Sequence, residues 1–125
     1  MNLHENKKLF RQAVQTTAQQ KGIPEIYIEK DYWVTHALYT IFTDPLGADA
    51  IFKGGTALSK CYKLIDRFSE DIDLTVLRKD GESDAQMKIK IRELGKVLTA
   101  QLPEVEIGGV TNKKGNIRKT AHTYE

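Results

Sequence analysis

The sequence has little of several features that mark specialised classes of protein. It contains one cysteine, Cys61, in 125 residues, so no disulfide can form within the chain. No apolar run approaches the roughly 18 residues needed to cross a bilayer, and the first residues lack the apolar core of a secretion signal. These absences exclude a disulfide-stapled secreted domain and a membrane-spanning protein, and we expect a cytoplasmic protein.

An excess of one sign of charge is also nearly missing. The chain has 19 Lys and Arg residues against 17 Asp and Glu residues, which gives a formal net charge of +2. This balance does not by itself indicate a nucleic-acid-binding protein. Between residues 107 and 124, however, four basic residues occur without an acidic one: Lys113, Lys114, Arg118 and Lys119. This segment is either a solvated hairpin tip or a patch that contacts phosphates.

Residues that bind zinc or act as nucleophiles are few and scattered. The three histidines, His4, His36 and His122, show no paired ligand spacing, so the sequence gives no sign of a zinc site. Cys61 falls in a predicted helix, where a small buried thiol is the ordinary role. Hydrophobic residues make up 40% of the chain and charged residues 29%, the composition of one ordinary globular domain.

What the sequence does contain is a glycine pair placed between a strand and a helix. Ile51 and Phe52 lead into Gly54 and Gly55, and a helix-forming run begins near Thr56. Amides in the first turn of a helix lack internal partners and attract anions, and glycine lets a phosphate approach the backbone. The pattern predicts a phosphate-binding turn, in which the Thr56 hydroxyl caps the helix or contacts the phosphate.

An acidic pair follows this turn in the sequence. Asp71 and Asp73 alternate with apolar residues in a run that continues to Leu77 and is typical of a strand, so both carboxylates are predicted to share one face. Adjacent like charges repel, and a divalent cation relieves the repulsion. Mg²⁺, or Mn²⁺ in its place, is commonly held by one or two carboxylates together with substrate phosphates. A glycine pair by itself most often marks a turn, but the two motifs together indicate phosphoryl or nucleotidyl transfer.

Three further polar residues lie close to these motifs in sequence. Lys60 comes four residues after Thr56 and shares its helix face, although a solvated lysine is the commoner outcome. Arg67 has the planar fork that clamps a triphosphate. Ser69 lies on the side of the aspartates if the strand already begins there; otherwise it is a turn residue.

The combined stretch resembles a known family. Residues 52–60, FKGGTALSK, followed by Leu64-Ile65 and by residues 67–74, RFSEDIDL, are similar to the AbiEii/AbiGii toxin family within the nucleotidyltransferase superfamily. Residues 28–34, IEKDYWV, also look like the segment that precedes the site in that family. The resemblance covers most of the chain from about Ile28 to Leu77.

The resemblance implies an activity and a set of partners. It implies a metal-dependent enzyme that transfers a nucleoside monophosphate from a nucleoside triphosphate to an acceptor such as tRNA or another RNA. It also implies a bacterial toxin–antitoxin or abortive phage infection system, with an antitoxin as a further partner. In this hypothesis the catalytic residues are Asp71, Asp73 and Ser69, the metal ligands are Asp71 and Asp73, and the nucleotide-binding residues are Gly54, Gly55, Thr56, Lys60 and Arg67.

The sequence departs from the family pattern at its end. Similar nucleotidyltransferases carry a third carboxylate on a later strand, but the sequence ends at Glu125. Glu106 has apolar neighbours but precedes the basic segment that the acid is expected to follow, and Glu125 fits no better. We therefore expect a truncated or N-terminal portion. A non-catalytic nucleotide- or nucleic-acid-binding remnant and a kinase-like phosphotransferase remain alternatives.

These patterns predict a single α+β domain of the nucleotidyltransferase type, with a small mixed sheet and helices mainly on one side. Its expected parts are N-terminal helices over residues 1–45, a motif core over 50–77 and a helix with a hairpin over 83–125. Within the first part we expect helices from Leu3 to Lys21 and from Pro24 or Ile28 to Thr43, ended by Gly22 and Asp44-Pro45. The expected later elements are a strand over 50–53, a helix from a capping box at Ser83 to Pro103, and strands over 105–110 and 117–124. Trp33 is expected to anchor the core, with base stacking as the alternative.

Overall fold

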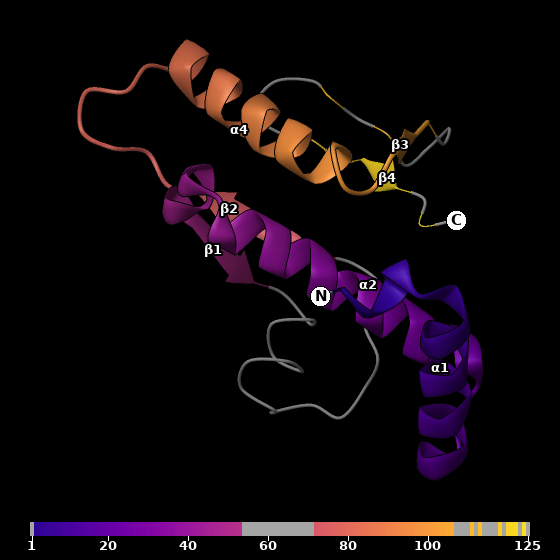
Figure 1. The fold of residues 1–125 in the computed structure, drawn as a ribbon. Coiled ribbons are helices and arrows are strands. Elements are labelled where there is room, and N and C mark those ends of the chain that lie inside the picture. Colours follow the sequence, from indigo (N-terminus) through magenta and orange to yellow (C-terminus); the bar gives the residue numbers. More distant parts are fainter. Residues whose placement is uncertain are drawn as a thin grey trace.

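The computed structural model describes residues 2–53, 72–106, 111, 113, 118, 120–122 and 124. Figure 1 shows a helical pair at the N-terminal end, a small sheet beyond it, and a helix that lies across the sheet before the C-terminal strands. The described elements are three α-helices and two two-stranded sheets. The predicted α+β class is confirmed.

The first predicted helix is broken near its start. A 3-10 helix, η1 (Leu3–Glu5), precedes the α-helix α1 (Lys7–Lys21). The Asn6 side chain accepts a hydrogen bond from the Leu9 amide at 3.1 Å, and asparagine is favoured as such a cap. The continuous helix predicted from Leu3 was therefore wrong in its first turn. The predicted end is confirmed, because Gly22 adopts φ 67°, a left-handed conformation that glycine tolerates.

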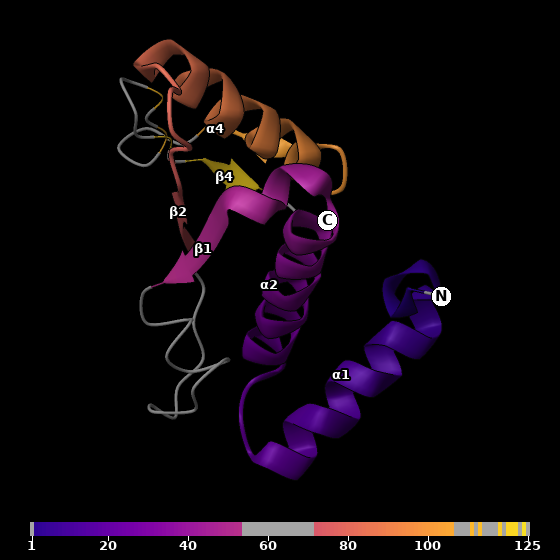
Figure 2. The ribbon, with the colours of Figure 1, turned by 90° about the vertical axis from the view of Figure 1, so that its left-hand side faces the viewer.

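Helix α2 (Glu25–Thr43) forms the middle of the molecule. It starts directly after Pro24 and ends at Asp44. The Asp44 side chain accepts from the Leu46 amide and caps the 3-10 helix η2 (Pro45–Asp49). Figure 2 shows α1 returning alongside one end of α2, while the sheet and the long helix α4 lie at its other end. The helices contact through small and branched apolar side chains, and the buried ones are Val14, Ala18, Val34 and Ala37.

The first sheet pairs β1 (Ala50–Lys53) with β2 (Asp73–Val76) in an antiparallel register that sets Ala50 opposite Val76 and Lys53 opposite Asp73. The predicted strand over 50–53 is confirmed. Side chains of a strand alternate between its faces, and the inner face joins a core formed by Ile41, Ala50 and Leu94 with Leu74, Val76 and Leu98 around it. Helix α4 (Asp84–Thr99) covers this inner face, and no described helix covers the opposite face of the sheet.

Helix α4 begins as predicted and ends earlier than predicted. Ser83 and Gln86 form the expected capping box. The α-helix stops at Thr99 rather than at Pro103, although Leu102 still bonds to the Leu98 carbonyl at 2.9 Å and is buried. Burial therefore continues beyond the regular part of the helix. Two short antiparallel strands follow, β3 (Glu104–Val105) and β4 (Ala121–His122).

None of the described helices has the length and apolar character needed to cross a membrane.

Candidate functional site

The two predicted motifs adjoin the end of the β1–β2 pair at which Lys53 lies opposite Asp73. Lys53 is the last residue of β1, and Asp73, the first residue of β2, lies directly opposite it. The chain runs from Lys53 into Gly54 and reaches Asp73 from Asp71. The antiparallel register therefore brings together the strand that leads to the glycine pair and the strand that follows the first aspartate.

Asp73 is the one predicted site residue that the described structure contains. Its side chain is exposed, and the alternation along β2 places it with Thr75 on the face that no described helix covers. The other predicted site residues, Gly54, Gly55, Thr56, Lys60, Arg67, Ser69 and Asp71, lie outside the described residues, as does Cys61.

The surroundings of Asp73 suit a divalent cation. A carboxylate oxygen is the hard ligand that Mg²⁺ prefers, and an exposed position leaves room for water and phosphate oxygens around such an ion. Across the strand pair, the side chain of Lys53 is also exposed, and an opposite-charge pair in this position stabilises a sheet by about 0.2–1 kcal/mol. The residue types at this strand end therefore fit both a negatively charged phosphate and a metal.

A lysine inside the fold holds the β1–β2 pair against α4. The Lys90 ammonium donates to Asp49 at 3.0 Å, to Glu82 at 2.8 Å and to the Leu77 carbonyl at 3.0 Å, and its side chain is only 12% exposed. The three partners lie just before β1, after β2 and before α4. Lys90 thus ties together the segments that flank the sheet.

The hydrogen bonds of Lys90 also set the charge states in this network. They hold the pKa of Asp49 and the pKa of Glu82 below the ordinary carboxyl values. The hydrogen bond to Glu82, followed by the contacts with Asp49, raises the pKa of Lys90. Sequence reasoning missed this network, although a signal was present: Lys90 lies three residues after Met87 and four before Leu94, on the buried stripe of α4.

The fold also brings two distant histidines together. The His4 and His36 rings lie 4.8 Å apart between centroids, and His4 Nδ1 is 2.8 Å from the Tyr32 hydroxyl. Burial, with a further contribution from His4, lowers the pKa of His36. The described residues contain no group of three or more His, Cys, Asp or Glu side chains that could hold a metal. This pair therefore joins η1 to α2 rather than completing a metal centre in the described part.

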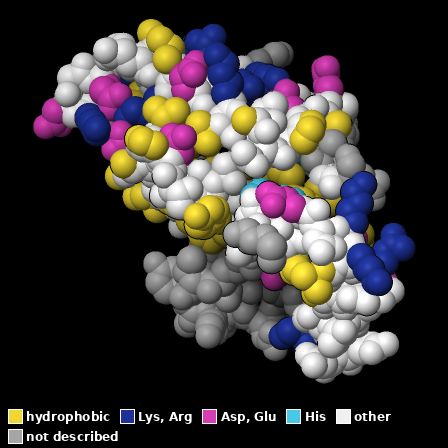
Figure 3. Space-filling model, viewed as in Figure 1, with side chains coloured by type: hydrophobic (Ala, Val, Ile, Leu, Met, Phe, Trp, Pro, Cys, Tyr) yellow, Lys and Arg dark blue, Asp and Glu magenta, His cyan; other side chains and the backbone are white. Residues whose placement is uncertain are grey.

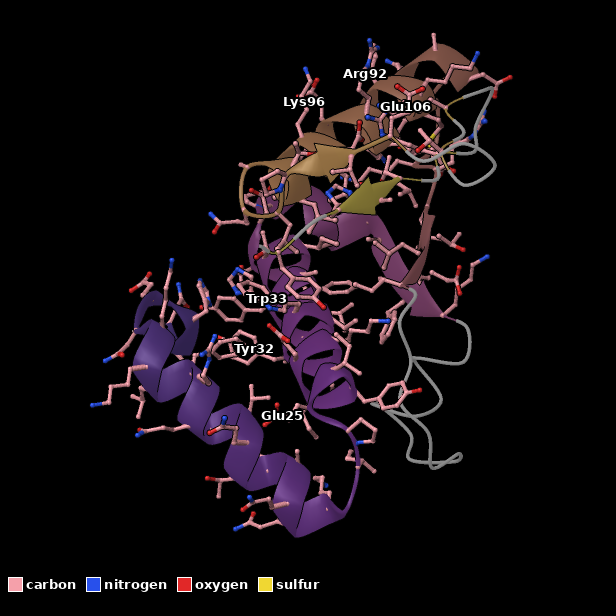
Figure 4. The ribbon with its side chains drawn as sticks, turned by 90° about the vertical axis from the view of Figure 1, so that its right-hand side faces the viewer. Glu25, Tyr32, Trp33, Arg92, Lys96 and Glu106 are labelled. Atoms are coloured by element: carbon pink, nitrogen blue, oxygen red, sulfur yellow. The ribbon has the colours of Figure 1, made fainter. Side chains whose placement is uncertain are left out.

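Trp33 belongs to the same aromatic cluster. Its indole stacks on Tyr124 with centroids 5.6 Å apart and an interplanar angle of 14°, and Figure 4 shows Tyr32 and Trp33 side by side on α2, near η1. The ring is partly buried. The expected anchoring role is supported, because Trp33 connects α2 with η1 and the C-terminal segment.

A second polar feature lies on the flank of α4. A pocket of about 340 Å³ is lined by Lys88, Ile91, Arg92, Lys113 and Arg118. Figure 3 shows Lys and Arg side chains gathered over α4, and in Figure 4 Arg92 points outward from the helix. The predicted basic segment thus contributes Lys113 and Arg118, while Lys114 and Lys119 lie outside the described residues. Sequence reasoning missed the contribution of Lys88 and Arg92.

One carboxylate offsets part of this positive charge. Glu104 lies 2.6 Å from the Lys113 ammonium and 3.6 Å from the Arg118 guanidinium, and the hydrogen bond from Lys113 holds the pKa of Glu104 below its usual value. Of the two candidates for a third carboxylate, Glu106 is exposed just after β3, and Glu125 lies outside the described residues.

Comparison with known proteins matches most of the chain to one family. The family model described as nucleotidyl transferase AbiEii toxin of a type IV toxin–antitoxin system matches residues 36–125. This range includes both predicted motifs, the whole Lys90 network and the basic pocket. A search of curated proteins and a search of solved structures each found no match.

Proposed function

Because this chain belongs to the AbiEii family of nucleotidyl transferase toxins of type IV toxin–antitoxin systems, we propose that it transfers a nucleoside monophosphate from a nucleoside triphosphate to an RNA acceptor such as tRNA. The family match over residues 36–125 is the observation that carries this proposal. It agrees with the resemblance found in the two sequence motifs. The cognate antitoxin is proposed as a further partner.

The proposed roles follow the two motifs. Asp73, together with Asp71, would hold Mg²⁺ or Mn²⁺, which when bound supplies positive charge at the reacting phosphate. Gly54, Gly55 and Thr56 would receive the triphosphate through backbone amides and a hydroxyl. The proposed assisting residues are Lys60, Arg67 and Ser69.

The register of β1 and β2 supports this assignment. Lys53 lies opposite Asp73. The residue that precedes the glycine pair and the last aspartate of the acidic motif therefore lie at the same end of the strand pair. Lys90 fixes the opposite end of the same strand pair through Asp49 and the Leu77 carbonyl. A strand pair that Lys90 holds in place is suited to presenting Asp73 with little reorganisation, which favours transfer chemistry.

A product assay tests the proposal. The purified chain is incubated with Mg²⁺, tRNA and each of the four nucleoside triphosphates, labelled either at the α-phosphate or at the γ-phosphate. Nucleotidyl transfer moves the α-label into RNA and releases pyrophosphate. Movement of the γ-label into RNA with release of nucleoside diphosphate would instead identify a phosphotransferase.

A separate binding measurement distinguishes the proposed enzyme from the non-catalytic alternative. Calorimetry with Mg²⁺ and each triphosphate measures binding independently of transfer. Triphosphate binding without label in RNA would overturn the proposed enzymatic activity and favour a nucleotide-binding role. Growth arrest on expression in bacteria, relieved by the cognate antitoxin, is the expected result for the toxin assignment.

A further inference from the structure

We propose that the pocket lined by Lys88 and Arg92 of α4 together with Lys113 and Arg118 binds the phosphodiester backbone of RNA. The identity of that RNA as the acceptor of the transfer reaction rests on the proposed function. The pocket is lined by residues that do not belong to the sequence motifs proposed to carry the transfer chemistry.

The charge of the pocket is the first argument. Lys88 and Arg92 come from successive turns of α4, and Lys113 and Arg118 come from the segment after β3. Among the described residues, Glu104 contacts Lys113 and Arg118, and the Asp84 carboxylate, which Arg78 also binds, interacts electrostatically with Lys88. The pocket therefore keeps an excess of positive charge, which a phosphate backbone would neutralise while releasing counterions.

The spacing of the two helical cations is the second argument. Lys88 and Arg92 are four residues apart, where like charges disfavour an isolated helix by a few tenths of a kcal/mol. The fold then adds the cations of a distant segment beside them rather than separating the charges. Lys7 and Arg11 on α1 have the same spacing, so the second pair of cations, Lys113 and Arg118, is what distinguishes the pocket. An anionic ligand would relieve this added repulsion.

The position of the Arg118 side chain is the third argument. Its Nε would lie 2.9 Å from a Cβ built at Gly95, so the guanidinium rests where α4 lacks a side chain. Only 21% of its side chain is exposed, and its contact with Glu104 is a loose ion pair at 3.6 Å. A guanidinium held in place and weakly paired is preorganised for the bidentate contact that arginine makes with phosphate.

The position of the pocket indicates an extended ligand. At about 100° per residue, Lys88 and Arg92 lie roughly 100–140° around α4 from Met87, which is buried on the core side of the helix. Leu94 and Leu98 of that side pack with Leu74 and Val76 of β2. The pocket therefore lies on the flank of α4 rather than against the strand pair, and a ligand that occupies the pocket and also reaches Asp73 has to be extended, as a nucleic acid is.

The test is an RNA-binding measurement without nucleotide or metal. Fluorescence anisotropy with labelled tRNA in EDTA is measured for the wild type, for the double variant Lys88→Gln/Arg92→Gln, and for Lys7→Gln/Arg11→Gln. The control pair has the same residue types and spacing, lies exposed on α1 and removes the same charge. Thermal unfolding of both variants checks the fold, which we expect to persist because all four side chains are exposed.

We expect the pocket variant to bind RNA at least about tenfold more weakly and to lower the dependence of log K on log salt by about two. The control should stay within about twofold of the wild type. Equal losses in both variants, an unchanged pocket variant, or no RNA binding by the wild type would overturn the proposal. Polyglutamate of matched charge is used as a competitor. If it displaces the labelled tRNA as effectively as unlabelled tRNA does, the proposal is also overturned, because the pocket would then bind any polyanion rather than a phosphate backbone.

Failure of this proposal is distinguishable from failure of the proposed function. Asp73→Asn should keep RNA binding in the EDTA assay while losing transfer. RNA binding through the pocket without transfer by the wild type would sustain the pocket assignment and refute the enzymatic one. A pocket variant that keeps both transfer activity and RNA affinity would refute the pocket assignment and sustain the enzymatic one.

Discussion

Lys53 lies directly opposite Asp73 at one end of the antiparallel pair formed by β1 and β2. Residues 54–72 connect these two positions and carry every other residue predicted for the site. The strand that precedes the glycine pair and the strand that contains Asp73 are therefore neighbours in space, although they are well separated in the sequence. The chemistry proposed for the family depends on this proximity.

Replacing Asp73 with asparagine should abolish metal-dependent transfer and leave the fold intact. The substitution keeps the shape of an exposed side chain but removes the negative charge that a cation requires. We expect the transfer rate to fall by about 10²-fold or more, with an unchanged unfolding midpoint in urea. Asp80→Asn, an exposed aspartate after β2, is the matched control; an equal loss of activity there would contradict a specific role for Asp73.

Local patterns predicted the elements well because their causes are local. The Ser83–Gln86 capping box, the left-handed Gly22 and the strand over residues 50–53 all follow from short-range hydrogen bonding, backbone freedom or alternation. The break at Asn6 is also local, and it was missed because the apolar period continued through it. The end of α4 was predicted too late, at Pro103, because apolar residues continue as far as Leu102, which is buried although it follows the last α-helical residue, Thr99.

Contacts between residues that are distant in the sequence were not predicted, because no local pattern encodes them. His4 and His36 show no ligand spacing, yet helix packing sets their rings 4.8 Å apart. The basic pocket likewise combines α4 with residues more than 20 positions later, which no helical period connects. Of the candidate site, the sequence predicted the strand that contains Asp73, whereas the exposed position opposite Lys53 required the register. The metal-binding role of Asp73 stays a prediction.

Lys90→Met should destabilise the protein and remove part of its response to extreme pH. The bridging ammonium is lost, and Asp49 and Glu82 are left near one another without their shared donor. Lys96→Met, at an exposed lysine paired with Glu93, should have a much smaller effect. Urea unfolding at neutral pH gives the comparison, and equal effects of the two substitutions would contradict the anchoring role.

The pH dependence of the Lys90 network has a defined direction. The folded-state pKa values of Asp49 and Glu82 are lowered, so their contribution is present above the unfolded values near 4 and is lost as the pH falls below them. The pKa of Lys90 is raised, so its contribution is present below about 10.4 and is lost as the pH rises above that value. Unfolding midpoints measured across the acid window should vary less in Lys90→Met than in the wild type.

His36 should make the protein less stable in mild acid. Its pKa is lowered in the folded state by burial and by His4, so the unfolded chain binds a proton more readily below about 6.5. Stability should therefore fall between about pH 7 and pH 5, and His36→Gln should flatten that fall. His122→Gln is the comparison, and an equal flattening by both variants would contradict the assignment to His36.

Truncation of Ile41 should reveal how much the strand pair depends on the helical core. Ile41 is 2% exposed and packs with Ala50 and Leu94, so Ile41→Ala should cost about 2–5 kcal/mol of unfolding free energy. Ile89 is 50% exposed on α4, and Ile89→Ala should change it by no more than about 0.5 kcal/mol. Chemical denaturation of both variants measures the difference, and similar costs would contradict the described core.

Gly95→Ala should separate helix stability from RNA binding. Glycine inside α4 costs about 1 kcal/mol relative to alanine, and the structure gives a reason for it: a Cβ there would lie 2.9 Å from Arg118 Nε and 3.6 Å from its Cδ. Because a flexible arginine can move aside, the variant should keep or gain stability while Arg118 leaves its seat. The expected result is an RNA affinity lowered by about threefold or more together with an unfolding free energy equal to or above that of the wild type.

Thr16→Ala provides the control for the gain in helix propensity. Thr16 is exposed on α1, so its replacement should raise stability by a few tenths of a kcal/mol and leave RNA affinity unchanged. A lower affinity with higher stability in Gly95→Ala could not come from partial unfolding, because unfolding would lower both quantities. Unchanged affinity in that variant would show that the position of Arg118 over Gly95 does not contribute to phosphate binding, and the pocket would then depend on Lys88, Arg92 and Lys113.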